Sequence, residues 1–213
     1  KEQSYLIIDS RYFDKAKERV TDCRVLLLED MRTQLTELLL KHNIRRLMLE
    51  SDYMTLSEYS AYKEQLHFVE LDSSPELSQF IRDMRIIKTP EEVALIVRAQ
   101  RIAERAFERL VDNISRDMTE KQVAALLNYY MMDCGADDLS FETIAASGVN
   151  SASPHAVPTD KKLQEGEFLT LDFGAVVDSY HSDMTRTLAV GQVSPEMEKL
   201  YNAVYYANQD GIK

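Results

Sequence analysis

Two aspartates, Asp172 and Asp183, occur eleven residues apart in a segment whose pattern predicts a β-hairpin. Apolar and polar residues alternate through residues 167–177, so one face of this strand is expected to meet a core and the other to carry polar side chains. A turn centred on Asp178 and Ser179 places Asp172 opposite Thr185 and diagonal to Asp183, at a Cα separation of ~7–8 Å. Two carboxylates at that distance can bind hard cations through oxygen.

Three residues near these aspartates belong to the same predicted cation site or to its surroundings. Thr185 is placed to hydrogen-bond a carboxylate that binds a cation, and Gly174 leaves room beside Asp183. His181 falls on the same polar face and is interpreted as a wall residue, with an adventitious nitrogen ligand as the alternative. A solvated hairpin face, where Asp and Thr are common, is the competing interpretation of the whole pattern, and residue spacing alone leaves it open.

The elements that position this hairpin lie in the second half of the chain. Thr89 with Glu92, and Thr119 with Gln122, have the spacing of helix-capping boxes. The first predicted helix is long and amphipathic, and the second is expected to end near Gly135. Strands are predicted at residues 141–146, 167–177 and 180–190, and a last helix begins at Ser194 and Pro195.

The first half of the chain alternates short apolar runs with helical periodicity. The runs predict strands at residues 5–8, 25–28, 47–50 and 68–71, and the periodic stretches predict helices at residues 11–20, 31–42, 56–65 and 75–84. Four strand–helix repeats imply a sheet with largely parallel neighbours, covered by helices. Thr55 with Glu58 and Ser74 before Pro75 mark two of the helix starts. We place a domain boundary near residues 85–88, which gives domains 1–86 and 87–213.

Composition excludes several classes of function. The 213 residues carry a net charge of −11, which would repel a phosphate backbone, so nucleic acid is not expected as a partner. The two cysteines, Cys23 and Cys134, have no CxxC spacing, which argues against a disulfide framework and a thiolate zinc site and favours a reducing, cytoplasmic location. The apolar runs are far shorter than the ~20 residues of a membrane span.

Four motifs together resemble one enzyme superfamily. The residues from Asp172 to Ala175 and from Ser182 to Thr187 resemble the metal-binding hairpin of the aminopeptidase P, prolidase and creatinase superfamily, in a bacterial aminopeptidase P-like form. Residues 146–155 resemble the family segment that delivers a substrate-side histidine, here His155. Residues 87–92 resemble the start of the catalytic domain, and residues 8–12 a stretch of the amino-terminal domain. The motifs are collinear and cover nearly the whole chain.

The resemblance implies an α/β fold: a creatinase-like amino-terminal domain, followed by the first part of a pita-bread catalytic domain. In that family two divalent ions, Mn²⁺ or Co²⁺, are held by two Asp, one His and two Glu. Asp172 resembles the ligand of one ion and Asp183 the Asp that bridges both, while His155 would be catalytic. The other three ligands lie beyond Lys213 in the family, so we expect a piece of a longer protein, incomplete at both ends and inactive alone.

The function that the resemblance implies is an Xaa-Pro aminopeptidase, a two-metal-ion hydrolase whose substrates are peptides with proline in the second position. A homodimer is expected. A prolidase limited to Xaa-Pro dipeptides is the nearest alternative, and a non-catalytic pita-bread binding module is a third. For His155 itself, a surface loop histidine between Pro154 and Pro158 is the simpler alternative.

Overall fold

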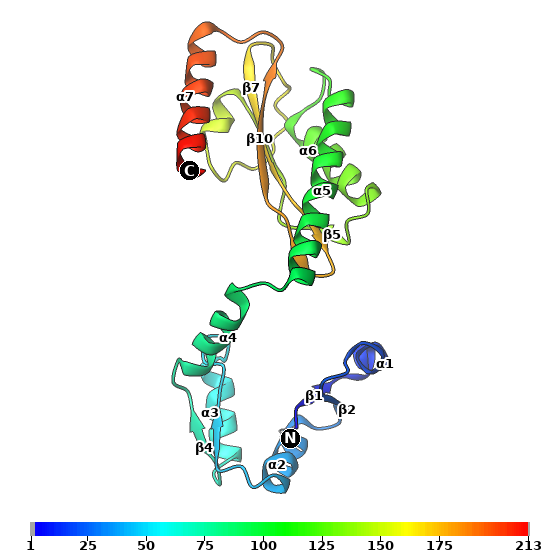
Figure 1. Cartoon of the computed structure of the whole chain (residues 1–213), viewed down its shortest axis with the longest axis vertical. Helices are drawn as coiled ribbons and strands as arrows, with labels where there is room; N and C mark the ends of the chain where they lie inside the picture. Colours follow the sequence, from blue (N-terminus) through cyan, green and yellow to red (C-terminus); the bar gives the residue numbers. More distant parts are fainter. Residues whose placement is uncertain (1–2, 213) are drawn as a thin grey trace. The chain divides into compact units, whose positions relative to one another are not determined.

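The computed structural model describes residues 3–212 (Figure 1). The chain divides into two compact units, with the division between Ile87 and Lys88. The first unit contains β1 (Tyr5–Ile8), α1 (Ser10–Arg19), β2 (Arg24–Leu27), α2 (Met31–Lys41), β3 (Arg46–Met48), α3 (Leu56–Gln65), β4 (Glu70–Asp72) and α4 (Glu76–Ile86). The predicted alternation of four strands and four helices is therefore confirmed, with bounds that differ by one or two residues.

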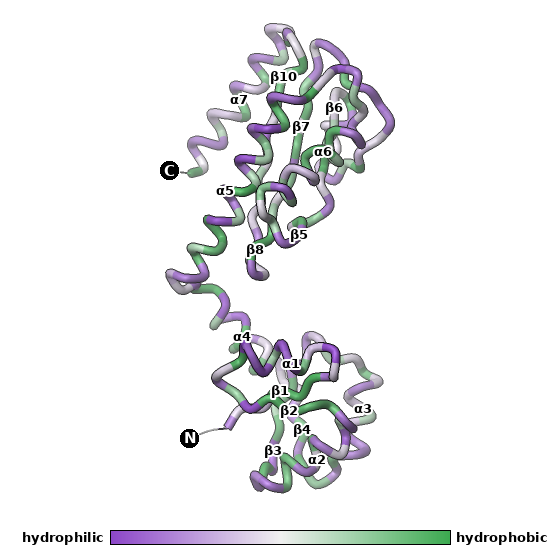
Figure 2. Tube along the Cα trace, turned by 90° about the vertical axis from the view of Figure 1, so that its right-hand side faces the viewer, coloured by the Kyte–Doolittle hydropathy of each residue, from purple (hydrophilic) through white to green (hydrophobic). Residues whose placement is uncertain are grey.

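The strands of the first unit form two sheets, so the prediction of one sheet is wrong. β1 pairs with β2 and β3 pairs with β4, each in parallel. Figure 2 shows β1 and β2 as mainly hydrophobic, yet every residue of β1 is only half-buried. Leu39, Leu66 and Val69 form a separate cluster that packs on β3 and β4. The two pairs thus bury different side chains, and their short strands are not joined by a ladder.

Two helix caps were predicted in the first unit, and one of them is present. Thr55 and Glu58 form the predicted capping box at α3. At α4 the N-cap is Pro75, without a side-chain cap. The backbone N–H of Ser74 donates instead to Asp72 Oδ1 at 2.9 Å. Ser74 is therefore part of a turn that follows β4, and its predicted role as a cap is wrong.

The second unit carries the predicted hairpin. Its elements are α5 (Pro90–Asn113), α6 (Glu120–Asp133), β5 (Asp138–Leu139), β6 (Ile144–Ser147), the 3-10 helix η1 (Gly148–Ala152), β7 (Glu167–Phe173), β8 (Ala175–Val177), β9 (Tyr180–His181), β10 (Met184–Val190) and α7 (Pro195–Ile212). The predicted capping boxes at Thr89 and Thr119 are both present. Gly135 follows α6 with a φ of +99°, the left-handed conformation expected of a residue that ends a helix.

A sheet in the order β10-β7-β6 forms the centre of this unit. Leu169, Leu171 and Phe173 on one face of β7 are fully buried in the core that α5 and α6 contribute to. On the opposite face, the rings of Phe168 and Tyr201 lie 5.9 Å apart and join β7 to α7. Figure 1 shows α7 on one side of the β7–β10 pair and α5 and α6 on the other. None of the helices in residues 3–212 has the length and apolarity that a bilayer crossing requires.

The register of the hairpin agrees with the prediction. Asp172 pairs with Thr185 in β7 and β10, and Val176 pairs with His181 in β8 and β9. The turn residues Asp178 and Ser179 have φ values of +47° and +68°, as in the type I′ turn that suits a two-residue hairpin loop.

The hairpin is not continuous, however, and this corrects the prediction of two unbroken strands. The ladder stops at Gly174 and resumes at Ala175, so that β8 and β9 belong to a second sheet with β5. A Cβ atom built on Gly174 would lie 2.0 Å from the backbone oxygen of Ser182. Ser182 in turn donates its backbone N–H to the Ala175 oxygen at 2.9 Å, and its hydroxyl accepts from the Ala175 N–H at 3.0 Å. Glycine is required here because the two backbones approach too closely for a side chain.

Replacing Gly174 with alanine is expected to destabilise the second unit. The added methyl would overlap backbone rather than a movable side chain, and overpacking of this kind costs about 1–3 kcal/mol. The measurement is the midpoint of chemical unfolding. Gly211→Ala is the matched control, since a Cβ at Gly211 meets no atom within 4 Å. Equal midpoints for both variants would contradict the proposed close approach.

Candidate functional site

A cavity of about 410 Å³ in the second unit brings together Asp172, Asp183 and His155. Asp172 comes from β7, Asp183 from the two residues between β9 and β10, and His155 from the irregular segment after η1. The rest of the lining is contributed by Phe141, Glu142, Thr143, Ile144, Ala156, Val157 and Pro158. Three residues predicted from separate motifs thus line one space, although their roles in it stay predictions. Glu142, which sequence reasoning did not single out, adds a third carboxylate to the wall.

The two aspartates differ in their surroundings. Asp172 is half-buried and accepts a hydrogen bond from the hydroxyl of Thr185 at 3.1 Å, which is the predicted contact. Asp183 is exposed and, within residues 3–212, has no hydrogen-bond partner. Within residues 3–212, no Lys or Arg side chain lines the cavity. Carboxylate oxygens that face a cavity without a cationic neighbour have the chemistry that hard divalent ions bind, so these residues fit such an ion.

The ligand set within the described residues is partial. In the stretch from residue 3 to residue 212, no group of three or more His, Cys, Asp or Glu side chains is arranged to hold a metal ion. Asp172 and Asp183 therefore contribute carboxylates, and the described residues do not complete a coordination sphere around them. Structural and catalytic metal sites in proteins generally use at least three protein ligands.

His181 lies outside this cavity. It lines a neighbouring cavity of about 320 Å³ beside α5, where Asp183 is also exposed to the space. The His181 Nδ1 atom and the Ser140 hydroxyl are hydrogen-bonded at 2.9 Å. His181 is thus a wall residue, as predicted, but of the second cavity, and Asp183 lies between the two.

A hydrogen bond fixes the far end of the hairpin to α5. The Tyr180 hydroxyl donates to Glu92 Oε1 at 2.6 Å, while the same carboxylate caps α5 by accepting from the Thr89 backbone. The bond from Tyr180 is the largest cause that holds the pKa of Glu92 below its ordinary value, followed by the bond from Thr89. The capping box predicted from sequence therefore also anchors the tip of the hairpin.

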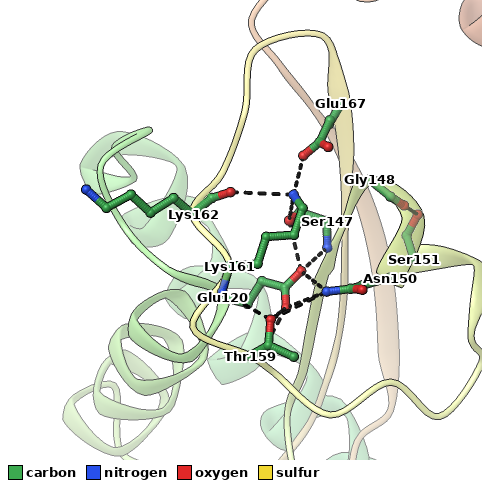
Figure 3. A network of polar contacts seen from close by, with 9 residues as sticks. All are labelled: Glu120, Ser147, Gly148, Asn150, Ser151, Thr159, Lys161, Lys162 and Glu167. Carbon is green, nitrogen blue, oxygen red and sulfur yellow. Dashed lines mark hydrogen bonds and ion pairs between the residues drawn. The ribbon is translucent and has the colours of Figure 1, made fainter.

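The segment that carries His155 is held by a carboxylate that the sequence analysis did not identify. Glu120, the first residue of α6, is fully buried and accepts hydrogen bonds from Ser147, Asn150 and Thr159 (Figure 3). Burial by itself would raise the pKa of Glu120, but these hydrogen bonds outweigh it and hold the pKa below its ordinary value. The carboxylate is therefore ionised inside the protein.

No signal in the sequence marks Glu120 as buried. An acidic residue in the first turn of a helix is common because it interacts favourably with the helix dipole, and it is usually exposed. The only hint is the polar composition of residues 147–161, whose hydroxyl, amide and amine groups need partners once the segment folds. Which acceptor they share depends on tertiary structure.

Comparison with known proteins agrees with this fold. The model of metallopeptidase family M24 matches residues 94–213, and that of the creatinase/prolidase N-terminal domain matches residues 1–87. The chain therefore belongs to metallopeptidase family M24, with a creatinase-type amino-terminal domain before the α/β domain that matches the M24 model.

The relatives whose activity is named are peptidases of the aminopeptidase P and prolidase type. The chain is 34% identical to the uncharacterized peptidase YqhT of Bacillus subtilis over 99% of its own length and 59% of that protein. Among solved structures, an X-Pro aminopeptidase of Thermotoga maritima matches with a TM-score of 0.91 and 33% identity, covering 98% of this chain and 59% of the other. An Xaa-Pro dipeptidase of Bacillus anthracis matches at 0.87 and 35%, covering 94% and 56%. The chain thus spans less than two thirds of each relative.

Replacing Tyr180 with phenylalanine is expected to raise the pKa of Glu92 toward its ordinary value of 4.5, because the carboxylate loses its strongest donor. The measurement is an NMR titration of the Glu92 carboxyl carbon. The stabilisation from the ionised form is present above about pH 4.5 and is lost as the pH falls, so the variant should depend less on pH in acid. Tyr129→Phe, on an exposed side chain, is the control. An unchanged titration of Glu92 would contradict the contact.

Proposed function

We propose that the protein containing this chain is an Xaa-Pro aminopeptidase, which hydrolyses the bond between the first residue of a peptide and a proline in second position. The observation that carries the proposal is the cavity that Asp172, Asp183 and His155 line together, with no Lys or Arg of residues 3–212 in its lining. Membership of metallopeptidase family M24 supports the reaction class.

Each of the three residues has a role in this proposal. Asp172 and Asp183 would hold the divalent ions through their carboxylate oxygens, and Thr185 would orient Asp172 through its hydroxyl. When bound, such ions activate water for attack and polarise the scissile carbonyl. His155, which also lines the cavity, would hydrogen-bond the substrate and transfer a proton to or from it. Because a proline imide nitrogen has no N–H, the substrate must be oriented through its carbonyl and side chain.

The finer features of the proposal come from the family resemblance and from composition. The ions are Mn²⁺, with Co²⁺ as the alternative, as the family resemblance implies. The active form is a homodimer in the cytoplasm. Cys23 and Cys134 are free thiols, which is in keeping with a reducing compartment.

A prolidase is the second candidate, because one of the similar solved structures is an Xaa-Pro dipeptidase at 35% identity. The two enzymes differ in whether the substrate may continue past the proline. The third alternative, a non-catalytic pita-bread module, is disfavoured because both aspartates are present and open to the cavity.

Peptide length discriminates between the first two candidates. An Xaa-Pro aminopeptidase is expected to release the first residue from Xaa-Pro-Yaa-Zaa peptides faster than from Xaa-Pro, whereas a prolidase acts only on the dipeptide. The measurement is the release of the free amino acid by the manganese-loaded protein. Xaa-Ala-Yaa-Zaa is the control peptide. Turnover of the dipeptide alone would establish the prolidase, and no turnover of any proline peptide would overturn both.

Replacing Asp183 with alanine and replacing His155 with alanine are expected to differ in their effects on bound metal and on turnover. Asp183→Ala should remove bound metal and activity together, since the family resemblance makes this carboxylate a ligand of both ions, and its loss would weaken the binding of each. His155→Ala should retain metal and lower kcat by ~10²–10⁴-fold, the range for a positioned proton-transfer group. Metal content and turnover are measured on the same samples. Asp160→Ala is the surface control, because its side chain is 82% exposed and, among residues 3–212, is paired with Lys121 alone. Equal metal loss in both site variants would contradict the role of His155.

A further inference from the structure

The wall of the cavity that carries His155 has no regular structure of its own. After η1, which ends at Ala152, residues 153–158 form neither helix nor strand. The His155 side chain is exposed and has no hydrogen-bond partner in the part of the chain that the structure describes. The position of His155 must therefore be set by the two ends of its segment, at Ser147 and Thr159.

Glu120 binds both of those ends at once (Figure 3). Its Oε1 atom accepts from the backbone N–H of Ser147 at 2.7 Å and from the Ser147 hydroxyl at 2.8 Å. Its Oε2 atom accepts from the backbone N–H of Thr159 at 3.0 Å and from the Thr159 hydroxyl at 2.6 Å. Asn150, inside the segment, donates to both oxygens at 3.0 and 3.1 Å. One carboxylate thus closes residues 147–159 into a loop.

The amino terminus of α6 holds the same end of the loop through its backbone. The N–H of Glu120 donates to the Lys161 oxygen at 3.0 Å, and the N–H of Lys121 donates to the Thr159 oxygen at 3.1 Å. Lys161, the nearest cation in the network, pairs with Glu167 at 2.5 Å and not with Glu120. The charge of Glu120 is therefore stabilised by neutral donors and by the helix dipole.

We propose that Glu120 is a positioning residue for His155: by binding Ser147 and Thr159 together, it holds the His155 segment against the cavity that Asp172 and Asp183 line. The catalytic half of this inference rests on the proposed function. Glu120 itself does not line the cavity, so its effect on the reaction passes through the segment.

Glu120→Gln tests the clamp because it keeps the size of the side chain and removes one acceptor. Ser147 and Thr159 each present a backbone N–H, which can only donate, so either orientation of the new amide directs its NH₂ group at one of them. One end of the segment is therefore released while the other stays bound. Glu165→Gln is the matched control, because Glu165 is an exposed glutamate of the same unit that pairs with Arg116, outside residues 147–159.

Hydrogen exchange measures the clamp independently of catalysis. In Glu120→Gln, the amides of residues 147–159 are expected to exchange about 10- to 100-fold faster, as for the loss of a hydrogen bond to a charged group. Amides of α5 and β7 and the metal content should not change, and Glu165→Gln should exchange like the unmodified protein in residues 147–159. Unchanged exchange in these residues, or an equal rise throughout the unit, would overturn the proposal. Thr159→Val, which removes one donor from an exposed residue, provides a milder test if Glu120→Gln does not fold.

A double-mutant cycle measures the link to His155. If Glu120 acts through His155, Glu120→Gln should lower kcat with little change in KM, and adding it to His155→Ala should alter kcat by no more than about twofold. Losses that multiply would overturn the link. If no proline peptide is hydrolysed at all, the proposed function fails together with the catalytic half of the inference. Normal hydrolysis with unchanged exchange refutes the positioning role alone.

Discussion

The geometry of the candidate site depends on the contact between the backbones at Gly174 and Ser182. This contact interrupts the ladder between two halves of a hairpin and sends them into different sheets. Buried Ser182 replaces the missing ladder bonds with its own hydroxyl and N–H, both bound to Ala175. Since Asp183 follows Ser182 directly, it lies outside the paired strands and is exposed to the two cavities. A continuous ladder would have restricted Asp183 to one face of one sheet.

Carboxylates of the second unit differ in how many hydrogen-bond donors surround them. Glu120 is fully buried, and both of its oxygens are saturated by N–H and O–H donors, which compensates for the loss of hydration. Asp172 receives one hydroxyl bond, so most of its acceptor capacity is open toward the cavity. A saturated carboxylate holds the protein's own backbone, whereas an unsaturated one is available to a ligand. In this fold, the number of hydrogen bonds to a carboxylate therefore distinguishes one that positions the backbone from one that is available to bind a ligand.

Sequence predicted the parts of this site that depend on local patterns. Period-two alternation and a two-residue turn were sufficient for the pairing of Asp172 with Thr185, and capping spacing was sufficient for the starts of α5 and α6. The break at Gly174 was not predictable, because apolar and polar residues alternate in the same way whether or not the chain passes from one sheet to another. Glu120 was missed because its partners lie 27 and 39 residues away. In the first unit, local periodicity could not tell one parallel sheet from two pairs.

The two sides of the cavity in the second unit are closed by loops of different length. They therefore differ in the chain entropy that is lost when each loop closes. The contact between Asp172 and Thr185 spans 13 residues, and that between Glu120 and Thr159 spans 39. Closing the longer loop costs about 1 kcal/mol more in chain entropy. The carboxylate side is therefore closed by the shorter loop, at the smaller cost in chain entropy. The histidine side is the one whose opening recovers more conformational freedom, and the carboxylate of Glu120 is what opposes that opening.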